Sequence, residues 1–199
     1  MAFEALKERL EKNGFAVTVF ETAAEAAEYL NKEIDGVSVA CGGSMGLKSM
    51  GLHQSLAAHN DFYYHKHGPE GMELMKKAAV TDVYLLSANG IAEDTGEIIS
   101  LDGTGNRVSS SLFGHKKVYF VAGKNKISPD FASALHRVRN VVAPHNAQRL
   151  GCKTPCAAKA DRCYNCDSPE RICRGLVVHY KRMKSMEMEV ILVNEELGY

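Results

Sequence analysis

Five of the six cysteines in this chain of 199 residues stand close together toward its end. They are Cys152, Cys156, Cys163, Cys166 and Cys173, and the last four follow the spacing C-x6-C-x2-C-x6-C. Four thiolates suit a tetrahedral zinc ion and equally a [4Fe–4S] cluster, because both are soft enough to prefer sulfur. We therefore predict a metal centre on Cys156, Cys163, Cys166 and Cys173, and the spacing leaves zinc and iron–sulfur open.

The residues around these cysteines are typical of a loop that folds around a metal. Gly151, Pro155, Pro169 and Gly175 punctuate the segment, which has few large apolar residues. Such a segment cannot build its own core, so metal binding would supply its order. The alternative is a set of reduced, buried cysteines, but free cysteines rarely crowd on a polar loop. Cys152 is either a spare thiol or a substitute ligand.

A second group of candidate residues follows a predicted buried strand at residues 36–40. Gly42, Gly43 and Ser44 are small enough to let backbone N–H groups approach an anion, helped by the start of the next helix. Ligands of open α/β sheets bind outside the carboxyl ends of the strands, which is where these residues fall. The alternative is a tight strand-to-helix turn, since the sequence matches neither a P-loop nor a dinucleotide fingerprint.

Polar residues also follow the next predicted strands. Asn89, Glu93 and Asp102 could orient or deprotonate a polar ligand, which makes them candidate catalytic residues. Arg107, the fourth candidate, could bind a carboxylate or phosphate through two hydrogen bonds. Ordinary turn chemistry explains the same residues, because Asp-Gly and Asn-Gly are common turn dipeptides.

Three weaker signals remain. His65 and His67 are expected to be solvated loop residues, and Cys41 a small core residue. The stretch 124–126 either faces an anionic ligand or forms a solvated loop. One predicted helix carries basic residues that we expect at the surface or at the rim of a site: His136, Arg137 and Arg139.

The elements that must position these residues alternate along the chain. Apolar spacing predicts helices at residues 3–13, 22–31, 69–79, 107–113 and 129–142, with a capping box at 22–25 and Ser128 as the N-cap of the last helix. Strands are predicted at 15–20, 36–40, 83–87, 117–122, 176–181 and 189–193, with a hairpin or outgoing strand at 93–101. This order favours a mostly parallel sheet with right-handed crossovers. We expect one α/β domain, residues 1–199, with a cysteine-rich loop at 151–175 inserted before the last strands.

The composition excludes several classes of protein. The chain has 24 Lys+Arg against 24 Asp+Glu, so its formal net charge is zero. A neutral chain is not expected to bind nucleic acid or anionic lipid by general electrostatic attraction. Its longest apolar stretches are strand-sized, and the start of the chain has no signal-peptide core. We therefore expect a cytoplasmic protein, where clustered cysteines are more often metal ligands than disulfides.

Long stretches of the sequence resemble a known family. GGSMGLKSMGL, DVYLLSANGIAEDTGEIISLDGTGNRVSSSLFGHKKVYFVAGKNKI and ALHRVRNVVAPHNAQRL resemble the LUD (lactate-utilisation, LutC/YkgG-like) family, and KTPC…CYNCDSPERIC…VILVNEELGY resembles its cysteine-containing members. The resemblance implies a NagB/RpiA/CoA-transferase-like fold, a Rossmann-like layered α/β structure. By analogy with related folds, the ligand pocket would be lined by Gly42, Gly43, Ser44, Asn89, Asp102, Gly103, Thr104, Gly105, Asn106 and Arg107.

The same resemblance implies a function. The family is associated with oxidation of lactate to pyruvate in a multi-protein iron–sulfur system, which favours a [4Fe–4S] cluster over zinc and implies redox partner subunits. The chain lacks a flavin or nicotinamide fingerprint and a ferredoxin cysteine run. The alternative is a stand-alone enzyme or sensor that binds a small anionic or CoA-linked metabolite and keeps a structural zinc. No nucleic-acid or membrane partner is expected, and a homo-oligomer is compatible with the sequence.

Overall fold

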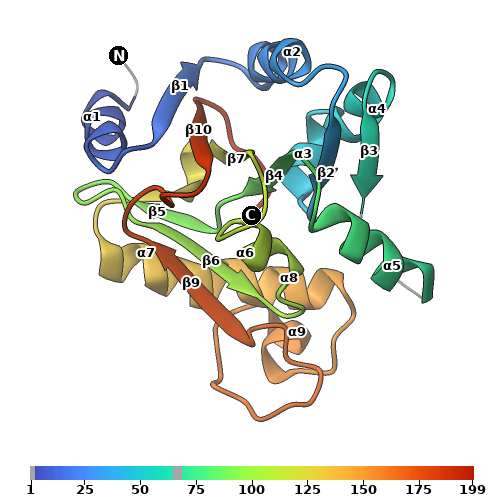
Figure 1. The fold of residues 1–199 in the computed structure, drawn as a ribbon. Coiled ribbons are helices and arrows are strands. Elements are labelled where there is room, and N and C mark those ends of the chain that lie inside the picture. The colour runs from blue at the N-terminus through green and yellow to red at the C-terminus, as the bar shows by residue number, and fades with distance from the viewer. Residues whose placement is uncertain (1–2, 65–68) are drawn as a thin grey trace.

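A six-stranded parallel sheet forms the centre of the computed structural model, which describes residues 3–64 and 69–199 (Figure 1). Its strand order is β1-β10-β7-β4-β2-β3, and every neighbouring pair runs parallel. The strands are β1 (Ala16–Phe20), β2 (Ser38–Cys41), β3 (Asp61–Tyr64), β4 (Val83–Ser87), β7 (Lys117–Gly123) and β10 (Glu187–Val193). The carboxyl ends of these strands therefore meet at one edge of the sheet.

A second, smaller sheet lies beside the first. Its order is β8-β5-β6-β9, in which β6 runs antiparallel to both of its neighbours and β5 runs parallel to β8. The strands are β5 (Gly90–Ala92), β6 (Ile98–Asp102), β8 (Ile127–Ser128) and β9 (Gly175–His179).

Short helices connect the strands. They are α1 (Glu4–Lys12), α2 (Ala23–Glu33), α3 (Met45–Ser49), α4 (Leu52–Ala57), α5 (Pro69–Ala78), α6 (Asn106–Ser110), α7 (Phe131–Arg137), α8 (Ala143–Arg149) and α9 (Pro155–Lys159). A 3-10 turn, η1 (Lys124–Lys126), follows β7, and a π-helical segment, η2 (Val138–Val142), joins α7 to α8. Within residues 3–64 and 69–199, every helix is too short or too polar to cross a bilayer.

The two sheets and their helices stack in layers. Helices α2, α3 and α4 cover one face of the large sheet, and α1 and the small sheet lie against its other face. Helix α7 and the segment η2 cover the outer face of the small sheet through Ala134 and Val138, respectively. The first four residues of β4 are apolar or aromatic because both faces of this strand are buried. Val83 and Leu85 enter one core cluster, whereas Tyr84 and Leu86 enter the other. The predicted layered α/β fold is confirmed.

Most predicted elements form at or within a few residues of their expected positions. The capping box is present, with the Thr22 hydroxyl accepting from the Glu25 backbone N–H and the Glu25 carboxylate accepting from the Thr22 N–H. One prediction is wrong: the N-cap of α7 is Asp130, whose carboxylate accepts from the Ser133 N–H at 2.7 Å, and not Ser128. Strand β3 had no clear sequence signal. His65 and His67 lie outside the described residues.

A buried ion pair joins two strands of the large sheet. The Lys117 Nζ lies 2.8 Å from a carboxylate oxygen of Glu189, whose side chain is 4% exposed. The hydroxyls of Thr18 and Tyr29 donate to the other carboxylate oxygen at 2.8 and 2.9 Å. Burial alone would raise the pKa of Glu189, but these hydrogen bonds outweigh it and lower the pKa. The carboxylate is therefore charged and satisfied, and its stabilising contribution is lost as the pH falls.

Replacing Lys117 with methionine should destabilise the fold by about 3 kcal/mol at neutral pH, because it leaves a charged carboxylate buried without its cation. The double variant Lys117→Met/Glu189→Leu should recover a large part of this loss. Urea unfolding at neutral and mildly acidic pH measures both. The single variant should lose less stability at the lower pH, because protonating the unpaired Glu189 removes the buried charge.

Lys116 provides the matched control. Its side chain is 81% exposed and pairs with Asp82 at 2.8 Å, so Lys116→Met should cost less than about 1 kcal/mol. Equal losses for the two lysine variants would contradict a special role for the buried pair.

Candidate functional site

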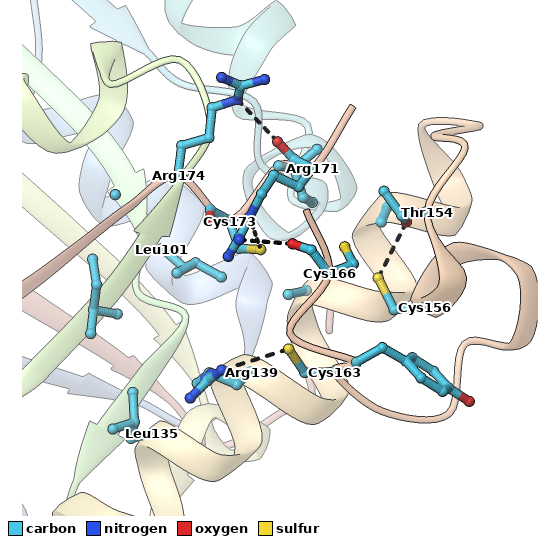
Figure 2. A pocket seen from close by; sticks show the side chains of 16 residues that line it. Leu101, Leu135, Arg139, Thr154, Cys156, Cys163, Cys166, Arg171, Cys173 and Arg174 are labelled. Atoms are coloured by element: carbon cyan, nitrogen blue, oxygen red, sulfur yellow. Dashed lines mark hydrogen bonds between the residues drawn. The ribbon is translucent and has the colours of Figure 1, made fainter. Parts of the chain in front are cut away.

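The four predicted metal ligands all line one cavity of about 240 Å³. Figure 2 shows the four cysteines around a common space. They come from α9, from the loop that follows it and from the stretch that leads into β9. The other residues that line the cavity come mainly from the small sheet, from the helix α7-η2-α8 and from the cysteine loop itself: Leu101, Leu135, Arg139, Ala143, Ala147, Thr154, Tyr164, Arg171, Ile172, Arg174, Gly175 and Leu176.

Local caps hold the cysteine-bearing segment in place. The buried Thr154 is the N-cap of α9, and its hydroxyl accepts from the Ala157 N–H at 3.2 Å and lies 3.3 Å from the Cys156 Sγ. The backbone N–H of Cys163 donates to the Asn140 side chain on η2 at 3.0 Å. The segment is therefore anchored to the π-helical segment as well as to its own short helix.

Arginines surround the sulfur atoms. The Arg171 Nε donates to the Cys173 Sγ at 3.3 Å, and its Nη1 donates to the Cys166 carbonyl at 2.9 Å. The Arg139 Nη2 lies 3.8 Å from the Cys163 Sγ. Hydrogen bonding to Cys173 and attraction to its thiolate raise the pKa of Arg171. Two guanidinium groups therefore lie against the sulfur atoms of the candidate ligands.

The sulfur atoms are not arranged around a single ion. Among the described residues, no three His, Cys, Asp or Glu side chains converge closely enough to hold one metal ion. Because a Zn–S bond is about 2.3 Å long, four thiolates on one zinc ion would lie about 3.8 Å apart. The thiols thus share a cavity and a loop, but they are more widely spread than mononuclear coordination requires.

The other two cysteines lie apart from this cavity. Cys41 is 2% exposed in the core beneath α3 and α4, as predicted. Cys152 is half-buried and is not part of the cavity lining. Burial, then the charges of Glu170 and Cys156, raises the pKa of Cys152, which disfavours the thiolate form of this residue.

Arg107, a predicted ligand-binding residue, donates all of its described hydrogen bonds to the protein. Its Nη2 donates to the Leu101 carbonyl at 2.6 Å and to the Asn89 Oδ1 at 3.1 Å, and its Nη1 donates to the Ser87 carbonyl at 3.1 Å. Its Nε lies 3.3 Å from the Asp102 carboxylate, and both side chains are nearly buried. The guanidinium thereby joins the ends of β4 and β6.

Most of the neighbouring candidate residues stabilise the turns in which they lie. The Asp102 carboxylate accepts from the backbone N–H groups of Thr104 and Gly105 at 2.9 and 2.8 Å. Gly105, at φ +93°, is the N-cap of α6, which Asn106 begins. The Ser44 hydroxyl caps α3 by accepting from Leu47. These contacts are turn chemistry, and a ligand-binding role for the loops stays a prediction.

The structure gathers some of the predicted residues and separates others. Gly42 lies directly against Arg107, since a Cβ at Gly42 would lie 3.0 Å from the Arg107 side chain. Gly43 is exposed, and a Cβ at this position would meet nothing within 4 Å. Glu93 lies elsewhere, in a surface hollow beside Arg9 and Lys12 of α1, so it does not share a site with Asn89, Asp102 and Arg107.

The cysteine loop packs against the predicted pocket loop. The Arg174 N–H donates to the Asp102 carbonyl at 2.9 Å. Gly103 touches the backbone of Ile172 so closely that a Cβ there would lie 2.8 Å from the Ile172 carbonyl oxygen. The cysteine loop and the loop that follows β6 lie far apart in the sequence, but they are in direct contact in the structure.

Comparison with known proteins agrees with this architecture. The family model of the LUD domain matches residues 3–193. The chain belongs to the LUD domain family. The crystal structure of a DUF162 family protein from Deinococcus radiodurans is similar at 17% identity, with a TM-score of 0.56, and the match covers 95% of this chain and 94% of that one. This identity supports the fold alone. A search of curated proteins finds no match.

In this LUD domain protein, Arg139 lines the cysteine cavity, which agrees with its expected place at the surface or at the rim of a site. Other contacts of basic residues were not specified by the sequence. Arg171 and Arg139 contact cysteine sulfurs, and Lys126 is buried although it was expected either to face a ligand or to lie in a solvated loop. For Arg171, the available sequence signal was its spacing from the cysteines. It follows Cys166 by five residues and precedes Cys173 by two.

Replacing Gly103 with alanine should loosen the cysteine loop, because the new methyl group would collide with the Ile172 backbone, at a cost of about 1–3 kcal/mol. Thiol titration of the metal-free protein should show faster reaction of the loop cysteines.

Gly43→Ala is the matched control, since a Cβ at Gly43 meets nothing within 4 Å. Unchanged thiol reactivity in Gly103→Ala would contradict the close packing of the two loops.

Proposed function

We propose that this LUD domain protein is an electron-transfer component that binds a [4Fe–4S] cluster through Cys156, Cys163, Cys166 and Cys173 and serves a lactate-to-pyruvate oxidation system. The observation that carries the proposal is that all four side chains line one cavity together with three arginines. No carboxylate lines that cavity among the described residues, so its donor set is sulfur only, as iron–sulfur clusters prefer.

A [4Fe–4S] cluster requires less convergence of its cysteine ligands than one zinc ion does. In a [4Fe–4S] cluster each thiolate binds a different iron, so the sulfurs stand farther apart than around one zinc ion. The arginines offset the negative charge that four thiolates bring.

Such a cluster supplies one-electron transfer when bound. Oxidation of lactate to pyruvate releases two electrons, so a single centre needs partner subunits that accept or deliver electrons. The cysteines are only partly buried, which leaves the cavity within reach of a partner. Arg171 and Arg139 would place donors and positive charge against the cysteine sulfurs, and Leu101 and Leu135 would keep water from one side of the cavity.

Anaerobic reconstitution with iron and sulfide should give a brown protein with four irons and four sulfides per chain, as a [4Fe–4S] cluster requires. Changing any one of the four ligands to serine should abolish or severely reduce cluster content. Cys152→Ser is the matched control, because this thiol lies outside the cavity, and it should bind iron normally.

Purification under the same conditions with one tightly bound zinc per chain, and no iron uptake, would overturn the redox proposal. That result would favour the alternative, a structural zinc in a protein that binds a small anionic or CoA-linked metabolite at the rim of the sheet.

Replacing Arg171 with methionine should make the reduction potential of the reconstituted protein more negative. Hydrogen bonds and positive charge near the sulfurs stabilise the reduced, more negative state, and this variant removes the donor to Cys173. Redox titration followed by electron paramagnetic resonance measures the shift.

Arg162 provides the control. It lies on the same loop, but it stacks on Tyr164 instead of donating to a cysteine, so Arg162→Met should leave the potential near its original value. An unchanged potential in Arg171→Met would contradict the assigned role of that arginine.

A further inference from the structure

Lys126 is a buried lysine without a partner among the described residues. Its side chain is 4% exposed, on the 3-10 turn that follows the central strand β7. Within residues 3–64 and 69–199, no hydrogen bond or ion pair uses its Nζ. The Nζ is also not one of the unpartnered polar atoms that are sealed from solvent, so the tip of the side chain keeps contact with solvent. An ammonium group in this position is costly, because it loses hydration and gains no acceptor.

The surroundings of Lys126 come from β5, α7 and η2. Ile127 pairs with Ile91 in parallel β8 and β5, which places Lys126 beside Gly90 at the start of the two strands. Gly90 has no side chain, and a Cβ there would lie 3.0 Å from Val138 and 3.2 Å from the Ala134 carbonyl oxygen. Helix α7 therefore packs directly over this point.

Two arginines approach the same place. The Arg137 Nη1 lies 3.4 Å from the Asn89 carbonyl oxygen, and the Arg107 Nη2 lies 3.1 Å from the Asn89 side-chain oxygen. Arg107 is neutralised by Asp102, whereas the acid nearest to Arg137 in electrostatic effect is the exposed Glu196. Lys126 and Arg137 thus leave positive charge at the carboxyl edge of the sheet without a buried carboxylate of their own in the described part of the chain.

We propose that Lys126 is a nucleophilic amine that forms an imine with a small aldehyde or ketone, and that Arg137 binds the carboxylate or phosphate group of the same compound. The amine nitrogen attacks the carbonyl carbon, a C–N bond forms, and the carbonyl oxygen leaves as water with the two amine hydrogens. The step is reversible and needs no oxidant or metal. It is also independent of what the cysteine cavity binds.

The electrostatics of the site suit this chemistry. Burial, followed by the charges of Arg137 and Arg107, lowers the pKa of Lys126 to about 7, so a large part of the amine is neutral and nucleophilic at neutral pH. Lysines that are desolvated or placed next to another cation are activated in this way. The acidic groups near these two arginines are Asp102, which forms an ion pair with Arg107, and Glu196, whose negative charge attracts Arg137.

Reductive trapping tests the proposal. The full-length protein is incubated at neutral pH with cyanoborohydride and one of three matched aldehydes: glyoxylate, glycolaldehyde phosphate or uncharged glycolaldehyde. Intact mass and peptide mapping then follow the adducts. We expect one adduct per chain, located on Lys126, with one or both anionic aldehydes and at least tenfold more slowly with glycolaldehyde. The two anionic arms distinguish a carboxylate ligand from a phosphate ligand.

Lys124 is the matched control, because it is exposed on the same turn. Lys126→Met should lose the adduct, and Lys124→Met should keep it. Lys126→Met should also fold, with a higher melting temperature near neutral pH, since it removes a buried unpaired amine. Arg137→Met should slow labelling by the anionic aldehydes more than labelling by glycolaldehyde, because it removes the anion-binding group as well as a charge that lowers the pKa of Lys126.

The pH dependence separates a reactive amine from random surface labelling. The labelling rate of Lys126 should rise through about pH 7 and then level off. Peptide maps of the unaltered protein give this result without any variant. Adducts spread over exposed lysines, or equal rates for charged and uncharged aldehydes, would overturn the proposal.

Discussion

The buried guanidinium of Arg107 is the constraint on which this region of the molecule depends. A buried cation must find acceptors, and Arg107 finds them on the carbonyl groups of Ser87 and Leu101, on Asn89 and on Asp102. These acceptors end β4 in the large sheet and β6 in the small one. A single side chain therefore fixes the relative position of the two sheets at their shared edge. The contact of Asp102 with the cysteine loop extends the same constraint to the metal-ligand candidates.

One continuous helical stretch serves both candidate sites. Arg137, at the end of α7, contacts the Asn89 carbonyl beside Lys126, and Arg139, two residues later in η2, approaches Cys163. The intervening segment is π-helical, a geometry that often marks functional sites. Because Asn140 of this segment also holds the Cys163 backbone, the geometry of the cysteine cavity and of the lysine site is set by the same element.

The order of strands and helices could be predicted from the sequence because its signals are local. Each of these signals lies within one short stretch of the chain. Examples are the capping box at Thr22, the apolar run of β4 and the four spaced cysteines. Predictions failed where two local signals competed, as at Ser128 and Asp130, where the carboxylate proved the better cap. Strand β3 had only four residues, too few for a clear pattern.

The sequence alone determined the layered α/β architecture and the identity of the four cysteines that line one cavity, since both follow from residue types and short spacings. Only the tertiary structure decided what surrounds them. It placed the Arg107 guanidinium against backbone carbonyls and Asp102, separated Glu93 from the other candidates in a hollow beside α1, and buried Lys126 away from any described partner. These outcomes depend on contacts between residues far apart in the chain, and desolvation and charge in such contacts leave no local pattern in the sequence.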